Sequence, residues 1–86
     1  MGEMMQTDRD RALIFVRRSY EVAVAMQTVD LDSINQARPV ELRYGSRADL
    51  VRDFWHAANA VSTFAVQMEL ISPSDAAEIL RSYSTL

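Results

Sequence analysis

The stretch that decides the fold is residues 46–71, SRADLVRDFWHAANAVSTFAVQMELI. Its apolar residues recur at helical spacing, which predicts one long helix over about residues 47–71. A first apolar stripe along this helix consists of Leu50, Phe54, Ala57, Val61, Phe64, Ala65 and Met68. A second stripe consists of Val51, Trp55 and Val66. Together the stripes cover roughly 240° of the circumference, so this helix is expected to pack against neighbours on several sides.

Two further helices are predicted on either side of this stretch. Thr7 and Asp10 form a capping-box pattern, and apolar residues at helical spacing follow it, which predicts a helix over about residues 8–28. The sequence SPSD at residues 72–75 combines a capping serine, a proline at the first helical position and an acidic residue. This pattern predicts a short C-terminal helix over about residues 73–83.

The segment between the two long helices, residues 29–45, is predicted to be an irregular linker because it is rich in Asp, Ser, Asn and Pro. A short helical turn is compatible with residues 33–37. Residues 40–44 alternate apolar and polar side chains, which is typical of a strand. A single strand has no partner within the chain, so we interpret these residues as extended linker, with pairing across a dimer as the alternative.

These elements predict an all-α fold: a small helical bundle of two long antiparallel helices and a short C-terminal helix. The chain has 86 residues, 49% of them hydrophobic, which fits one globular domain over residues 1–86, with residues 1–6 as a disordered tail. Two neighbouring helices, one of them short, cover such a broad apolar helix only in part. We therefore expect a homodimer with a four- or six-helix core.

Groups that carry catalysis are scarce in this sequence. Cys and Lys are absent. Asp53 could join the one histidine, His56, from three residues before it, but two ligands do not make a metal site. The carboxylates of Asp49 and Asp53 lie one helical turn apart, but helix capping explains Asp49 more simply. Nucleophilic catalysis needs an activated nucleophile beside a base. The sequence therefore predicts a non-enzymatic protein with no catalytic residue, cofactor or metal site.

Charge and aromatic residues indicate where a protein partner binds. The net charge of −3 disfavours non-specific binding to nucleic acid, although residues 38–52 carry four of the nine arginines. Trp, Tyr and Arg are enriched at binding hot spots. The predicted interface comprises Arg43, Tyr44, Arg47, Val51, Arg52, Trp55 and Val66. The alternative for Trp55 is packing beneath the linker.

The expected function is that of a small helical protein that binds and modulates another protein. Its size, acidity and layout are typical of small regulators and of inhibitors encoded by phages and mobile elements, an analogy of shape only. One alternative is a small dimeric DNA-associated transcriptional regulator, because residues 64–81 have helix–turn–helix order, although Asp75 and Glu78 repel phosphate. Another is an accessory subunit of a larger assembly. The polar start and the lack of a long apolar run predict a cytoplasmic location without membrane contact.

Overall fold

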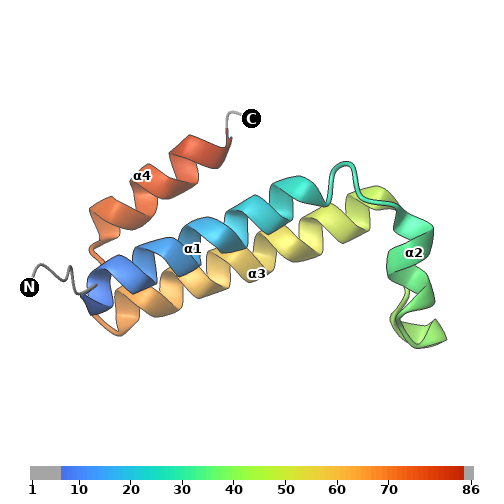
Figure 1. Ribbon diagram of the computed structural model, residues 1–86, viewed down its shortest axis with the longest axis horizontal. Coiled ribbons are helices and arrows are strands. Elements are labelled where there is room, and N and C mark those ends of the chain that lie inside the picture. Colours follow the sequence, from blue (N-terminus) through green and yellow to red (C-terminus); the bar gives the residue numbers. More distant parts are fainter. Residues whose placement is uncertain (1–6, 85–86) are drawn as a thin grey trace, which may run out of the picture.

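The computed structural model describes residues 7–84, and every regular element in this range is a helix. The elements are α1 (Asp8–Ala25), α2 (Leu31–Gln36), the 3₁₀ helix η1 (Val40–Leu42), α3 (Arg47–Gln67) and α4 (Pro73–Ser84). Helices α1 and α3 lie side by side and antiparallel, α4 lies against this pair on one side, and α2 projects at the end remote from the N-terminus (Figure 1). The predicted all-α bundle is confirmed. The predicted disordered tail at residues 1–6 lies outside the described residues.

The capping patterns predicted at residues 7–10 and 72–75 both form. In α1 the Thr7 hydroxyl accepts a hydrogen bond from the Asp10 amide, and the Asp10 carboxylate accepts one from the Thr7 amide. Ser46 caps α3 through the amide three residues later. At α4 the Ser72 hydroxyl and the Asp75 carboxylate exchange hydrogen bonds with each other's amides, both 3.0 Å long. These bonds satisfy amides that lack a partner inside the helix, and they fix where each helix begins.

Helix α3 ends at Gln67, earlier than the predicted residue 71, because a C-terminal cap stops it. The Leu70 amide donates to the Ala65 carbonyl at 3.0 Å, and the Glu69 amide donates to the Val66 carbonyl at 2.9 Å. This pair of bonds is the Schellman motif. It places Glu69 in the left-handed region, with φ of 61°, a position that glycine usually occupies. The turn then brings α4 back along α1.

Helix α1 also ends before the predicted residue 28. Its last helical residue is Ala25, and residues 26–28 continue as tighter turns in which the Gln27 and Thr28 amides bond to carbonyls three residues back. The guanidinium of Arg47 donates a 2.8 Å hydrogen bond to the Met26 carbonyl. One of the carbonyls left open at the end of α1 is therefore satisfied by the first residue of α3.

The segment predicted as an irregular linker is more ordered than its sequence indicated. Asp30 caps α2, and the extended conformation expected from residue 40 onwards was wrong for Val40–Leu42, which form η1. With no neighbouring strand in the described chain, local bonds take over: the Leu42 amide bonds to the Pro39 carbonyl. The Asn35 side-chain amide completes the segment by bonding to both the amide and the carbonyl of Tyr44, at 2.8 and 3.0 Å.

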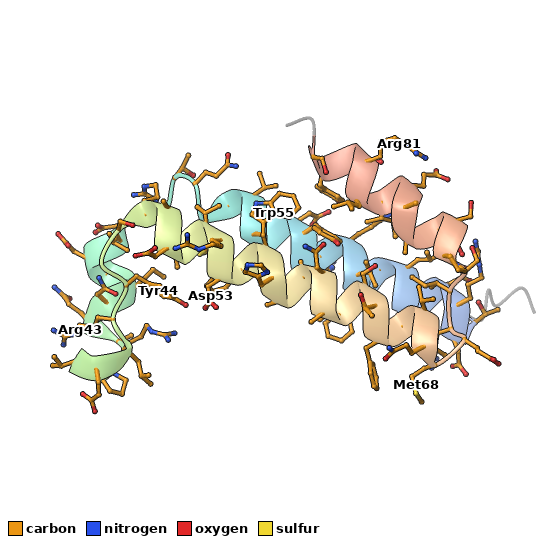
Figure 2. All side chains as sticks on the ribbon, turned by 180° about the vertical axis from the view of Figure 1, so that it is seen from behind. Arg43, Tyr44, Asp53, Trp55, Met68 and Arg81 are labelled. Atoms are coloured by element: carbon orange, nitrogen blue, oxygen red, sulfur yellow. The ribbon has the colours of Figure 1, made fainter. Side chains whose placement is uncertain are left out.

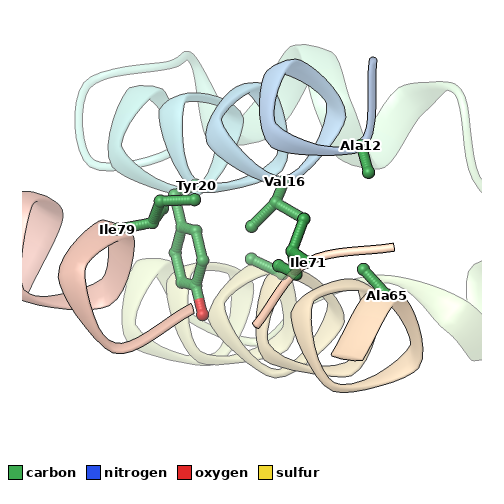
Figure 3. Close-up of a cluster of buried hydrophobic side chains, with 7 residues drawn as sticks. Ala12, Val16, Tyr20, Ala65, Ile71 and Ile79 are labelled. Atoms are coloured by element: carbon green, nitrogen blue, oxygen red, sulfur yellow. The ribbon is translucent and has the colours of Figure 1, made fainter. Parts of the chain in front are cut away.

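The contact between α1 and α3 is built mainly from small side chains. Its buried residues are Ala12, Val16, Tyr20 and Ala23 from α1, with Leu50, Ala58, Ser62 and Ala65 from α3. Ile71 and Ile79 close the cluster from the α4 side (Figure 3). Because alanine and serine occupy little space, the two long helices have little room for large residues between them. Three aromatic residues, Tyr20, Trp55 and Tyr83, gather on the α4 side, where Tyr20 stacks on Tyr83 with ring centroids 5.9 Å apart.

The left-handed Glu69 offers a test of the cap. A Glu69→Gly substitution is expected to raise the free energy of unfolding by about 1 kcal/mol, because glycine adopts this conformation without a steric penalty. Chemical denaturation followed by far-UV circular dichroism measures the change. The matched control is Ala77→Gly on the exposed side of α4, which is expected to lower the free energy by about 1 kcal/mol. A loss of stability in Glu69→Gly as well would contradict the assignment.

Asp75 predicts a dependence of stability on acid pH. Its hydrogen bonds with Ser72 come first among the causes that hold the pKa of its carboxyl below the ordinary value, and the Arg9 guanidinium, 2.9 Å away, adds to them. A lowered pKa in the folded state means that the charged carboxylate stabilises the fold above the unfolded pKa, and that this contribution is lost as pH falls through the folded pKa. Between about pH 5 and pH 2, wild type should therefore lose more stability than Asp75→Asn. Parallel profiles in urea unfolding would disprove this role.

Candidate protein-binding surfaces

Two residues of the predicted interface pack inside the chain. The Trp55 ring lies 5.3 Å from the Tyr20 ring at a tilt of 55°, and both Trp55 and Val66 pack against the buried cluster. Trp55 thus covers the core, as the alternative interpretation held, but its neighbour is α1 rather than the linker. Burial raises the pKa of the Tyr20 hydroxyl, which donates to Asn59 across the two long helices. These side chains hold α1, α3 and α4 together.

Three other predicted interface residues gather at the α2–η1 end of the molecule. Arg43 donates through Nε to the Arg38 carbonyl at 3.2 Å, and Arg47 bonds to α1 as described above. Tyr44 lies under the Arg38 guanidinium, whose central carbon is 4.6 Å from the ring centroid. The Tyr44 hydroxyl donates to Asp53, and this bond is the main reason that the pKa of Tyr44 is raised. The end is therefore a connected group of polar contacts.

The remaining two residues of the predicted interface, Val51 and Arg52, lie on α3. Arg52 forms an exposed ion pair with Asp49, and Val51 is half-buried. From Val51 to Val66 the helix rises about 22 Å, so the seven residues do not make one continuous surface. Arg43 and Tyr44 both contact Arg38, Arg47 bonds to the end of α1 instead, and Val66 lies far from all three. Binding of a partner by any of these residues stays a prediction.

The exposed apolar surface lies on the first stripe of α3 rather than on the second. Phe64 and Met68 are 60% and 56% exposed, and from α1 they are joined by Phe15 at 63% and Val22 at 45%. We call these four residues the apolar face. Figure 2 shows Met68 pointing away from α4, whereas Trp55 lies on the α4 side of α3. Helix α4 thus covers one side of the α1–α3 pair, and no other part of residues 7–84 covers the opposite side.

A groove of about 690 Å³ lies between α1 and α3 at Phe15 and Phe64 of the apolar face. Ala12, Val16 and Ala65 are buried beneath it, and Phe15 and Phe64 stand exposed at its sides. Asp8 and Arg11 border it from the start of α1, with their charged groups 3.9 Å apart. Its lining is otherwise apolar, and its volume is in the range of ligand and peptide clefts.

The spacing of residues on this side of α3 is that of helices that pack in bundles. Phe54, Ala57, Val61, Phe64 and Met68 follow one another at intervals of three and four. On α1, Phe15 and Val22 are seven residues apart. Such a heptad pattern places one side chain per turn on a face that meets another helix. This interval was present in the sequence, and it is the signal that marks Phe64 and Met68 as candidate contact residues.

The described residues contain neither a cluster of metal ligands nor a membrane-spanning helix. Across residues 7–84 no three His, Cys, Asp or Glu side chains come close enough together to hold a metal ion. Within the same range no helix has both the length and the apolar character needed to cross a membrane.

Comparisons of the chain with protein-family models, with curated proteins and with solved structures gave no match.

The Asn35 bridge predicts the behaviour of the α2–η1 end. Asn35→Ala removes both bonds to Tyr44, so the Tyr44 amide loses its acceptor and should exchange with solvent at least about ten-fold faster. Hydrogen exchange followed by NMR measures this rate. Amides in the middle of α1 and α3 should be unchanged, and so should all amides in the control Gln36→Ala, which alters an exposed residue of the same helix. An unaltered Tyr44 rate would show that the bridge does not hold this end.

Proposed function

We propose that this chain is a non-enzymatic helical protein that works by binding another polypeptide through its apolar face, as a small regulator or inhibitor does. The observation that carries this proposal is the exposure of Phe15 and Phe64 on one side of the α1–α3 pair. Fully burying a phenylalanine is worth about 1.5–3 kcal/mol, so each ring retains about 1–2 kcal/mol of unused burial. Exposed apolar patches of this kind mark interaction sites in soluble proteins.

The groove favours an α-helical partner over a small molecule. Its sides come from two antiparallel helices, and the α3 side has the spacing of helix–helix contacts. An amphipathic helix binds such a surface through anchors at intervals of three and four residues. Among residues 7–84, the charged groups at the groove are Asp8 and Arg11, one of each sign, so the surface selects by shape and apolar contact more than by net charge.

The α2–η1 end supports a second contact with a partner. Val40 and Leu42 are 71% and 56% exposed there, beside Arg43. Arginine and tyrosine with exposed apolar neighbours match the composition of protein interfaces. Because Asn35 fixes Tyr44 and Arg38 lies over its ring, this end presents a defined shape, which lowers the entropy cost of binding.

Photo-crosslinking in the native cell tests the proposal. A benzophenone amino acid is placed at Phe64 or at Phe15, and in the control at Glu78, an exposed residue of α4. Illumination is expected to give adducts of discrete mass with a polypeptide from the two positions on the apolar face, and none from Glu78. If neither face position gives an adduct, the proposed binding surface is wrong.

A further inference from the structure

We infer that the polypeptide bound by the apolar face is a second copy of this chain. The two copies pack face to face, so that α1 and α3 of both form a four-helix core with one α4 on each outer side. This inference rests on the proposed function and names the partner for its main site. It uses the apolar face itself and leaves the α2–η1 end of each copy open to solvent.

The area of the apolar face matches what a stable dimer needs. An aromatic side chain presents about 150–250 Å², so Phe15 and Phe64, each more than half exposed, leave about 100–150 Å² apiece in solvent. Met68 and Val22 bring the face to about 400–500 Å² of apolar surface. A standard interface buries about 800 Å² per partner, and homodimer interfaces are about 65% apolar. The apolar share of such an interface is therefore about 500 Å², close to what this face offers.

The contour of the face is self-complementary. Along α3, Ala57 and Ala60, which are small and exposed, come before the large side chains Phe64 and Met68. When a second α3 lies antiparallel across the face, with the two-fold axis near Val61, Phe64 of one copy comes opposite Ala57 of the other. Phe64 of each copy then meets Ala57 of the other on both halves of the contact, and Met68 comes opposite the exposed Asp53. Because the two copies are related by a two-fold axis, the contact between Phe64 and Ala57 forms twice.

Charge also permits a second copy on this face. The acidic and basic groups at the border, Asp8 and Arg11, already lie within 3.9 Å of each other at one end of the groove. The four members of the face are uncharged. The charged residues beside them, Arg18 on α1 and Asp53 on α3, are exposed, and Asp53 already accepts a hydrogen bond from Tyr44. The arrangement extends the bundle that α1 and α3 begin, in the manner of four-helix bundles.

Light scattering on a size-exclusion column, over a range of protein concentrations, tests this inference. Wild type is expected to elute with twice the 9.8 kDa mass of the chain. Phe64→Asp places a charge in both halves of the contact and is expected to raise the dimer dissociation constant by on the order of 100-fold or more. Its far-UV circular dichroism should match wild type, because Phe64 is exposed within the single chain. The matched control Val40→Asp makes the same change at the α2–η1 end and should stay dimeric.

Each other outcome overturns the inference in a defined way. A wild type that stays monomeric at all concentrations shows that the partner is not a second copy. A dimer that Val40→Asp disrupts and Phe64→Asp does not shows that the copies meet at the α2–η1 end. Photo-crosslinking then separates this failure from failure of the proposed function: a monomer whose Phe64 position captures a different polypeptide keeps the function, whereas a monomer that captures nothing loses both.

Discussion

The close packing of α1 against α3 is the constraint on which the rest of the structure depends. Ala12 of α1 belongs to one buried cluster with Ala58 and Ala65 of α3, so little side-chain volume separates the two helices there. Most of the large apolar side chains outside this contact lie on one side of it or on the other. On one side Tyr20, Trp55 and Tyr83 build an aromatic cluster that seats α4. On the other side Phe15 and Phe64 remain in solvent.

Much of this fold is readable from local patterns. The capping residues before α1, α3 and α4 predict where each helix begins, because a serine or threonine hydroxyl satisfies an open amide regardless of the rest of the chain, and at α1 and α4 an acidic residue three positions later satisfies a second one. The predicted C-terminal ends of α1 and α3 were less accurate than the predicted starts. Glu69 occupies the left-handed position after the helix, where glycine is usual. Because glycine is absent there, the sequence did not indicate that α3 ends at Gln67.

The side of α3 that remains open was not predictable from periodicity alone. Both stripes are apolar, and a helical wheel ranks them by hydrophobicity, not by what packs against them. The deciding contacts are long-range: Tyr20 of α1 brings Trp55 inside, and Ile79 of α4 closes over the same side. The structure of the α2–η1 end was not predictable for a related reason. The side chain of Asn35 bonds to the backbone amide and carbonyl of Tyr44, as a neighbouring strand would. Such side-chain to backbone bonds have no sequence period.

Stability and binding are linked in a molecule with this layout. A chain of 86 residues buries a smaller share of its surface than a larger domain, and its one short covering helix, α4, is used on a single side. Whatever covers the apolar face binds the folded chain and not the unfolded one, so it stabilises the fold by mass action. The Ala-rich contact thus has two consequences at once. It keeps the α1–α3 pair thin enough for one α4 to complete one side, and it leaves the large residues of the other side available to a partner.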